Sequence, residues 1–218
     1  MQRFVDRAVT IAGREYRYVV YVTPAVGSVN GSMPLVVFLH GSGECGRDNA
    51  KQVTVGLAPA ILLRPEAWPC VVIFPQKPTR ESQWEDHEDA VLAMVEAARK
   101  EFAIDEARIS LTGLSQGGHG SWEIGVRHPE LWAAVAPICG YGDAALIARR
   151  WKGTPVWAFH GLKDNVVPWS KTGDVVAALN AAGHGVSFTT YADLDHNSWD
   201  RTYRESGLAA WLLAQRQR

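Results

Sequence analysis

The sequence feature that most constrains the fold is the segment Arg108–Pro129. Residues 108–112 alternate apolar and polar side chains, which predicts a short strand. Residues 113–118 read GLSQGG and contain G-x-S-x-G, and helical character follows until Pro129. Strand and helix can meet so closely only where the neighbours lack a Cβ atom. This context predicts a strained turn that lifts the Ser115 hydroxyl clear of a sheet, beside the N–H groups of a helix. A solvated serine in a glycine-rich turn is the alternative.

The length and charge of the chain narrow the class of protein. With 218 residues, 47% of them hydrophobic, we expect one domain over residues 1–218 with one sizeable core. The 22 basic and 23 acidic residues argue against a nucleic-acid partner and against a polybasic membrane anchor. No apolar run approaches the roughly 18 residues of a membrane span. Residues 1–7 carry charges where a signal peptide is apolar, so we expect the chain as given to be cytoplasmic; a leader removed beforehand would change that expectation.

The three cysteines do not predict a disulfide or a metal site. Their number is odd and they lack the spacing of metal ligands. Cys70 and Cys139 fall in or beside apolar strands, which predicts that they are small buried hydrophobes, whereas Cys45 lies in a polar loop. His40, His160 and His196 also lack the H-x-H and HE-x-x-H patterns of metal sites. We therefore predict no metal and no cofactor.

Strands and helices alternate along the chain. Apart from the strand at 108–112, strands are predicted at 35–39, 70–74, 133–138, 155–159 and 186–191, with a hairpin over 9–22. Helices are predicted at 85–102, 171–182 and 202–215. The pattern predicts an α/β fold, with a mostly parallel central sheet, an antiparallel N-terminal hairpin and helices on both faces. Residues 141–153 are too few for a cap domain, so we expect an open cleft.

Ser115, Asp164 and His196 each follow a different predicted strand. Because the carboxyl ends of parallel strands meet at one edge of a sheet, we expect the three side chains to converge there. A serine hydroxyl becomes a nucleophile when a neutral imidazole takes its proton, and a buried carboxylate then orients the imidazole. The chain order of nucleophile, acid and histidine supports these roles. Asp193 and Asp195 lie nearer to His196 in sequence but follow no strand of their own.

Such chemistry also needs an oxyanion hole. One donor is expected to be the N–H of Gln116, the residue after the nucleophile. The other is expected from the glycine-rich residues 40–44, HGSGE, where Ser42 or Gly43 can turn a backbone N–H toward Ser115.

Together, GLSQGG, HGSGE, the pair His160-Gly161 with Asp164, and DHNSW at 195–199 resemble the α/β-hydrolase superfamily. They are most similar to its small lidless esterases of the phospholipase/carboxylesterase and feruloyl-esterase-like type. The resemblance covers roughly residue 35 to the C-terminus. It implies an α/β-hydrolase fold with Ser115 as nucleophile, Asp164 as acid and His196 as base. The N–H groups of Ser42 and Gln116 would then form the oxyanion hole.

Several residues near the predicted strand ends are candidates for substrate binding. Gly43 and Glu44 follow Ser42 in the oxyanion loop, residues 40–44. Trp84, Trp169 and Trp199 fall in predicted loops near strand ends, where their rings can line the cleft, and Trp84 is favoured because it follows the strand that ends at Phe74. Glu44 either orients a substrate group or only bonds nearby backbone. His40 and His160 precede glycines at strand ends and are expected to bond backbone around the site, whereas the remaining tryptophans on helix and strand faces are expected in the core.

The expected function is a serine carboxylic-ester hydrolase that acts through an acyl-enzyme. An open cleft favours short-chain or aryl esters and the exposed ester ends of polymers, so the expected partner is a small-molecule or polymer-end substrate. A peptidase, a thioesterase or an acyltransferase would use the same three residues. A non-catalytic binding protein of the same fold is a more distant alternative. The pattern does not indicate the oligomeric state.

Overall fold

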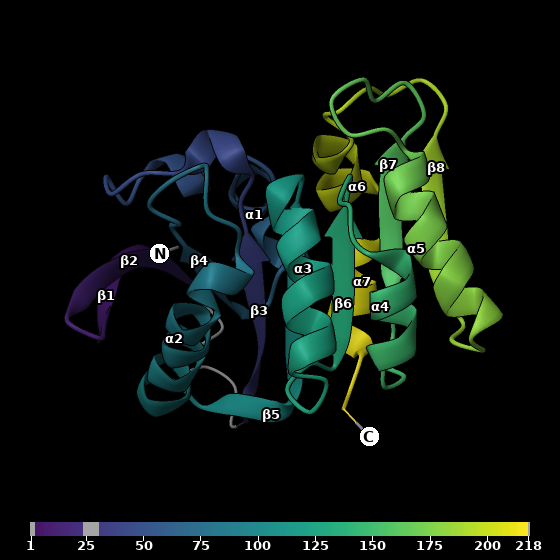
Figure 1. The fold of residues 1–218 in the computed structure, drawn as a ribbon. Coiled ribbons are helices and arrows are strands. Elements are labelled where there is room, and N and C mark those ends of the chain that lie inside the picture. The colour runs from purple at the N-terminus through teal and green to yellow at the C-terminus, as the bar shows by residue number, and fades with distance from the viewer. Residues whose placement is uncertain (1–2, 24–30, 218) are drawn as a thin grey trace.

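The fold is organised around an eight-stranded sheet whose strand order is β1-β2-β4-β3-β5-β6-β7-β8 (Figure 1). A computed structural model describes residues 3–23 and 31–217. The strands are β1 Arg3–Ile11, β2 Arg14–Val22, β3 Met33–Leu39, β4 Val71–Pro75, β5 Ile104–Leu114, β6 Ala134–Ile138, β7 Trp157–Gly161 and β8 Ser187–Tyr191. The α-helices are α1 Leu57–Leu63, α2 Glu88–Glu101, α3 Gln116–Arg127, α4 Ala144–Arg150, α5 Ser170–Ala181, α6 Trp199–Glu205 and α7 Leu208–Ala214. Short 3-10 turns are η1 Ser42–Glu44, η2 Lys51–Val53, η3 Pro65–Ala67 and η4 Glu85–His87.

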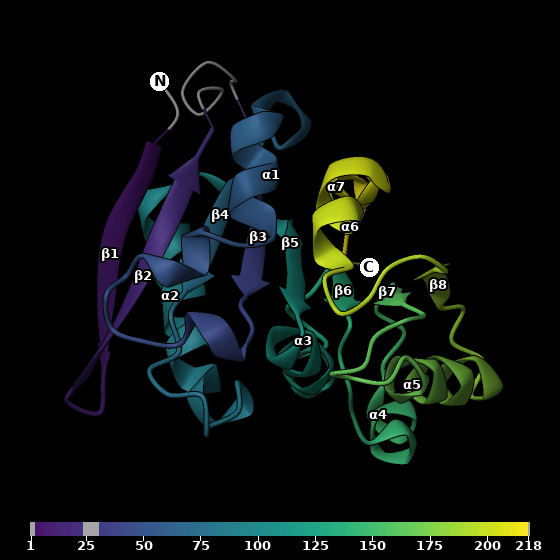
Figure 2. The same ribbon diagram turned by 90° about the horizontal axis from the view of Figure 1, so that it is seen from above.

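The predicted α/β architecture is confirmed. β1 and β2 form an antiparallel hairpin and β2 is antiparallel to β4, whereas the pairs from β4 through β8 are parallel. Figure 2 shows α2, α3, α4 and α5 on one face of the sheet and α1, α6 and α7 on the other. Between β6 and β7 the chain forms only the seven-residue α4. No cap domain therefore covers the carboxyl edge at that point.

Both faces of the sheet are packed, which is why its central strands read as continuous apolar runs. In β3, Leu35 and Val37 point into the core beneath α2 and α3, and Val36 and Phe38 point into the core beneath α1 and α6. All four are fully buried. Cys70 and Cys139 are buried and unpaired, as predicted.

Element boundaries differ from the predictions at three places. The predicted closing helix over 202–215 is two helices, because Gly207 between α6 and α7 adopts φ 83°. The predicted helix over 85–102 begins with the 3-10 turn η4, and α2 starts at Glu88. The connection over 141–153 contains α4, which Asp143 caps by accepting the Leu146 N–H.

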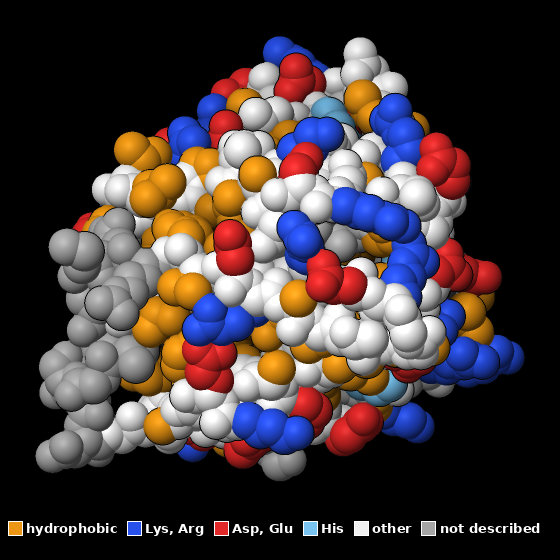
Figure 3. All heavy atoms as spheres, turned by 90° about the vertical axis from the view of Figure 1, so that its left-hand side faces the viewer, with side chains coloured by type: hydrophobic (Ala, Val, Ile, Leu, Met, Phe, Trp, Pro, Cys, Tyr) orange, Lys and Arg blue, Asp and Glu red, His pale blue; other side chains and the backbone are white. Residues whose placement is uncertain are grey.

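The surface carries charges of both signs. On the face at the β1 edge of the sheet, basic and acidic side chains are interspersed around apolar ones (Figure 3). This distribution agrees with the net charge of −1. Among the helices that the structure describes, none combines the length and the apolar character needed to cross a membrane.

Candidate active site

Ser115 lies in the sharp turn between β5 and α3. Its backbone has φ 54° and ψ −116°, a conformation that non-glycine residues rarely adopt, and its N–H donates to the Ile138 carbonyl at 2.9 Å. A Cβ atom on Gly117 would lie 1.9 Å from the Leu39 carbonyl oxygen, and one on Gly113 would lie 2.3 Å from the Gly117 oxygen. The glycines of the G-x-S-x-G pattern therefore allow the close approach of strand and helix that the sequence predicted.

Ser115, His196 and Asp164, here called the relay, are in hydrogen-bond contact with one another. His196 Nε2 lies 3.0 Å from Ser115 Oγ, and His196 Nδ1 lies 2.7 Å from Asp164 Oδ2. The other carboxylate oxygen, Asp164 Oδ1, accepts the N–H groups of Val166 and Val167 at 2.9 Å each. The Asp164 side chain is fully buried and that of His196 is 18% exposed. The carboxylate is thus held at both oxygens, while the imidazole and the hydroxyl can be reached from outside.

The alternative acids do not contact His196. Asp193 forms a two-bond ion pair with Arg201, at 2.7 and 2.8 Å. Asp195 accepts the Asn197 N–H at 3.1 Å. Both carboxylates lie close to His196 in the chain, but Asp193 binds Arg201 and Asp195 binds the Asn197 N–H.

Backbone contacts bring the acid and base loops together. The Leu162 N–H donates to the Tyr191 carbonyl and the Lys163 N–H to the Leu194 carbonyl, each at 2.9 Å. A Cβ atom on Gly161 would lie 2.2 Å from the Asp195 carbonyl oxygen. The loops after β7 and β8 therefore pack directly on each other, which places Asp164 and His196 side by side.

His160 makes a contact that the sequence analysis did not identify. Its Nε2 lies 2.9 Å from the Val167 carbonyl oxygen, as expected for a residue that bonds backbone, but also 3.1 Å from Asp164 Oδ2. Its Nδ1 lies 2.8 Å from the Thr172 hydroxyl. Burial lowers the pKa of His160 below its ordinary value. The spacing of four residues between His160 and Asp164, across the end of β7, was the available signal.

The oxyanion loop is anchored by His40. Its Nε2 accepts the Lys77 N–H at 2.9 Å, and its Nδ1 donates to the Gly41 carbonyl at 2.6 Å. Burial lowers the pKa of His40 to about 3, so the ring is neutral at pH 7. A Cβ atom on Gly41 would lie 3.5 Å from the Ser115 Cβ atom, which shows how closely this loop approaches the nucleophile turn.

Ser42 and Gln116 each begin a helical turn. Ser42 is the first residue of η1 and Gln116 the first of α3, and the N–H groups at such positions have no partner within the helix. The side-chain amide of Gln116 is engaged elsewhere, because its Nε2 donates to the carbonyls of Arg80 and Ser82 at 3.1 Å each.

The prediction that Trp84 contacts substrate is wrong. The side chain is 1% exposed, its Nε1 donates to the His40 carbonyl at 2.9 Å, and its ring packs edge-on against His40. Gly120 of α3 covers its Cβ atom. Trp84 lies directly before η4, and its buried side chain supports the oxyanion loop through its contacts with His40. Trp199, another of the tryptophans considered for the cleft, lies beside the relay, with its ring 5.3 Å from the His196 ring.

Glu44 and Gly43 differ in exposure. Gly43 is exposed, whereas one carboxylate oxygen of Glu44 is buried and has no hydrogen-bond partner among the described residues. Burial raises the pKa of Glu44, and backbone N–H groups of the same turn oppose that rise. Glu44 therefore packs against its own loop, which agrees with the alternative that it bonds nearby backbone.

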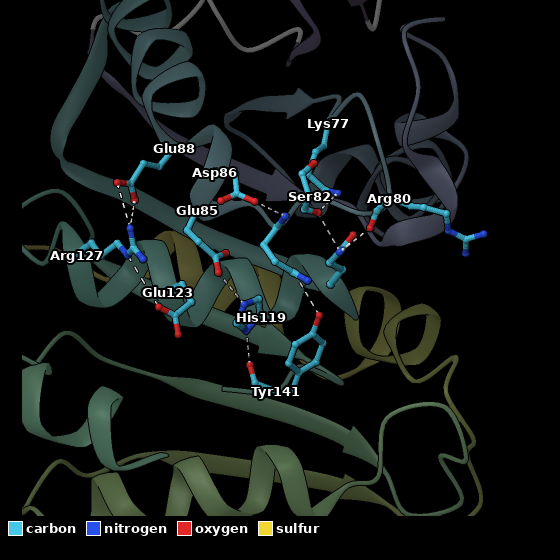
Figure 4. A network of polar contacts seen from close by, with 12 residues as sticks. Lys77, Arg80, Ser82, Glu85, Asp86, Glu88, His119, Glu123, Arg127 and Tyr141 are labelled. Carbon is cyan, nitrogen blue, oxygen red and sulfur yellow. Dashed lines mark hydrogen bonds and ion pairs between the residues drawn. The ribbon is translucent and has the colours of Figure 1, made fainter. Parts of the chain in front are cut away.

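A cavity of about 470 Å³ lies beside the relay, between α3 and the loops after β6 and β7. His119 and Tyr141 line it with stacked rings, 4.4 Å apart and 8° from parallel. His119 Nδ1 lies 2.9 Å from the Tyr141 carbonyl oxygen and its Nε2 lies 3.1 Å from Glu85 Oε1 (Figure 4). Burial alone would lower the pKa of His119, but these two contacts raise it above its ordinary value. The pair with Glu85 therefore favours a positively charged ring.

Within the described residues, one trio presents possible metal ligands at close range. Ligand atoms of Cys139, Asp164 and His196 lie within 4.8 Å of one another. Asp164 and His196 are hydrogen-bonded to each other, and burial raises the pKa of the Cys139 thiol, which keeps it protonated. Two of the three possible ligands are therefore bonded to each other in the relay, and the third is a protonated thiol.

Comparison with known proteins identifies the family. The model of the phospholipase/carboxylesterase family matches residues 58–205, more than half of the chain. The chain belongs to this family. The expectation of an α/β-hydrolase esterase is therefore confirmed at the level of family and fold.

Individual relatives agree with this family assignment. A thermostable esterase of known structure is 34% identical and superposes with a TM-score of 0.86, covering 98% of this chain and 63% of its own. The NocK protein of Nocardia uniformis subsp. tsuyamanensis, which is named as an esterase, is 25% identical over 186 residues, 81% of this chain and 53% of NocK. The chain thus spans about half to two thirds of the length of these relatives. The fold alone is shared with S-formylglutathione hydrolase from Staphylococcus aureus, which is 13% identical and covers 98% of this chain and 97% of its own, with a TM-score of 0.76.

Proposed function

We propose that this family member is a serine carboxylic-ester hydrolase that works through an acyl-enzyme. The observation that supports this proposal best is the continuous contact from Ser115 Oγ through His196 to the buried carboxylate of Asp164, at 3.0 and 2.7 Å. Three residues that lie far apart in the chain provide a hydroxyl, a base and an orienting carboxylate in one line. That arrangement is the one that acyl transfer requires.

In the first half of the reaction, Ser115 Oγ attacks the ester carbonyl carbon as His196 Nε2 takes the hydroxyl proton. The carbonyl electrons move onto oxygen, where the N–H groups of Ser42 and Gln116 stabilise the negative charge. Loss of one such donor typically costs about 3–4 kcal/mol of transition-state stabilisation. The tetrahedral intermediate then expels the alcohol, which receives the proton from His196, and leaves an acyl group on Ser115.

In the second half, His196 takes a proton from water as the water oxygen attacks the acyl carbon. Collapse of the intermediate releases the carboxylic acid and returns the proton to Ser115. Throughout, Asp164 accepts the Nδ1–H of His196 and stabilises the imidazolium that forms in each half. The fixed Asp164 oxygens hold the imidazole in a single orientation.

The proposed substrates are short-chain or aryl esters and the exposed ester ends of larger molecules. The proposal rests on the short connection between β6 and β7, which contains α4 and no cap, and on the cavity of about 470 Å³ beside the relay. Such a site surrounds only part of a large substrate.

The test compares Ser115→Ala with wild type on p-nitrophenyl butyrate and with a fluorophosphonate probe. Ser115→Ala should lose at least about a thousandfold in kcat, and only wild type should gain the mass of the probe. Ser187→Ala, at an exposed position in β8, is the matched control and should behave as wild type. Unlabelled wild-type protein, or turnover by Ser115→Ala close to wild type, would refute the proposal. Matched ester, thioester and amide substrates then separate an esterase from a thioesterase or a peptidase.

A further inference from the structure

The cavity beside the relay contains a carboxylate that the proposed reaction does not use. Glu123 of α3 lines this cavity and is only 8% exposed. Among the described residues its carboxylate has no hydrogen bond, and its ion pair with Arg127 Nε spans 3.9 Å (Figure 4). A buried carboxylate without a hydrogen-bond donor is costly in free energy. Its place in a cavity wall therefore points to a positively charged group that arrives from solution.

The other charges of the cavity leave it with a negative balance. His119 is paired with Glu85 at 3.1 Å, so its positive charge is matched. Asp143 is a second carboxylate of the lining, and one of its oxygens already accepts the Leu146 N–H at 2.9 Å. Lys171 is the opposing cation of the lining and is exposed. Glu123 has Arg127 as its cation, but Arg127 is shared with Glu88, and among the lining residues Asp143 has only the exposed Lys171, so negative charge remains in excess.

The remaining walls suit an alkylated cation better than a hydrated metal ion. The ring of Tyr141 lines the cavity, as do the side chains of Val167 and Pro168. Aromatic faces attract cations, and apolar walls accept the carbon atoms that an organic ammonium group carries. A small metal ion would instead need several oxygen ligands at short range.

The cavity adjoins residues that contact the relay. Val167 lines the cavity and its N–H binds Asp164 Oδ1 at 2.9 Å. His119 also lines it, and its N–H donates to the Ser115 carbonyl at 3.0 Å. Two residues of the cavity wall, Val167 and His119, therefore contact Asp164 and Ser115 directly.

We propose that this cavity is a substrate subsite for an organic ammonium group, with Glu123 as its anionic partner. The inference rests on the proposed ester hydrolysis and adds a substrate class to it, namely esters whose acyl or alcohol part carries a protonated amine or a quaternary ammonium. Glu123 acts in binding and takes no part in the bond-making steps.

Two isosteric pairs of esters test the subsite. Butyrylcholine and 3,3-dimethylbutyl butyrate differ in charge on the alcohol side. The p-nitrophenyl esters of 4-(trimethylammonio)butanoate and 5,5-dimethylhexanoate differ in charge on the acyl side. Wild type should prefer the cationic member of at least one pair by about tenfold in kcat/KM, the effect of one charge-assisted contact. Glu123→Gln, which keeps the side-chain shape, should bring that ratio close to one.

The matched control is Glu106→Gln, which makes the same change in net charge. Glu106 lies near the amino end of β5, opposite to the end that Ser115 follows, and its side chain is 61% exposed. This variant should keep the wild-type ratio. Equal rates for both members of each pair in wild type, a preference for the neutral esters, or an unchanged ratio in Glu123→Gln would overturn the subsite while ester hydrolysis stands.

A binding measurement separates this inference from the proposed function. If wild type hydrolyses none of the four esters, ester hydrolysis itself is in doubt, and calorimetry with choline and with 3,3-dimethylbutan-1-ol decides the subsite. Choline should bind wild type more tightly than the neutral alcohol, and Glu123→Gln should lose that difference. No preference for choline in wild type would overturn the subsite.

Discussion

At the end of β7, one oxygen of the Asp164 carboxylate lies within hydrogen-bond distance of two imidazoles. His196 Nδ1 lies 2.7 Å and His160 Nε2 lies 3.1 Å from Asp164 Oδ2. His160 is fully buried, and its Nδ1 lies 2.8 Å from the Thr172 hydroxyl, which also lies 2.8 Å from the Gly140 carbonyl oxygen. We infer that His160 is a positioning residue that limits the movement of the carboxylate.

Replacing His160 with glutamine should therefore lower kcat more than it raises KM. A carboxylate displaced by a fraction of an ångström misaligns His196, and we expect kcat to fall about tenfold or more. The measurement is kcat and KM on p-nitrophenyl butyrate together with the melting temperature. Thr172→Val removes the hydroxyl contacts with His160 and with the Gly140 carbonyl but keeps His160 beside Asp164, so it should have a smaller effect on kcat. A variant with a lower melting temperature but wild-type kcat would show that His160 stabilises the fold without positioning the acid.

The sequence predicted the residues of the relay better than their surroundings. Ser115, Asp164 and His196 are each marked by local patterns at strand ends, and the parallel order of strands brings those ends together. The contact between His160 and Asp164 depends on how the loop after β7 folds back, and the burial of Trp84 depends on α3 packing over it at Gly120. Such contacts are set by tertiary packing, which a local pattern does not record.

Among the helices, the break between α6 and α7 shows why boundaries were harder to predict than the elements themselves. The apolar pattern of residues 202–215 continues through the break, whereas Gly207 turns the chain with φ 83° and ψ 7°. Glycine adopts this conformation without strain, and it commonly ends helices. The glycine was the signal for the break, but periodicity alone favoured one longer helix. The strands and the order of the elements depend on stronger apolar runs and were predicted from them.

The conformation of Gly207 leads to a prediction about stability. A Cβ atom there would meet nothing within 4 Å, so substitution tests the backbone alone. Gly207→Ala should lower the free energy of unfolding by about 1 kcal/mol, and Gly207→Asn by less, because asparagine tolerates this region better. Gly185 is the matched control, since its Cβ position is also open but its φ is not positive. Urea unfolding in which Gly207→Ala costs no more than Gly185→Ala would contradict the prediction.

Across the whole molecule, buried histidines tie the stability of the fold to pH. Burial lowers the pKa values of His40, His87 and His160, that of His40 to about 3. The folded protein binds protons at these rings less readily than the unfolded chain, where histidines take up protons as the pH falls below about 6.5. The unfolded state then binds more protons than the folded state, so the free energy of unfolding falls as the solution becomes more acidic. His119 acts in the opposite direction, because its raised pKa stabilises the fold below its folded pKa and that contribution is lost as the pH rises.

The contribution of His40 can be isolated. Between pH 6 and pH 4.5, His40 binds a proton in the unfolded chain but not in the folded protein. This difference should lower the free energy of unfolding by about 1.4 kcal/mol for each pH unit of acidification. His40→Gln keeps an amide oxygen for the Lys77 N–H and removes the titrating group. Its unfolding free energy, measured by urea at several pH values, should fall less steeply than that of wild type, by close to one proton in the slope. The carboxyl groups titrate in both proteins and cancel in this difference. Equal slopes would mean that His40 takes up its proton in the folded state. That result would contradict the prediction, because burial and the two hydrogen bonds of the ring are expected to keep it neutral.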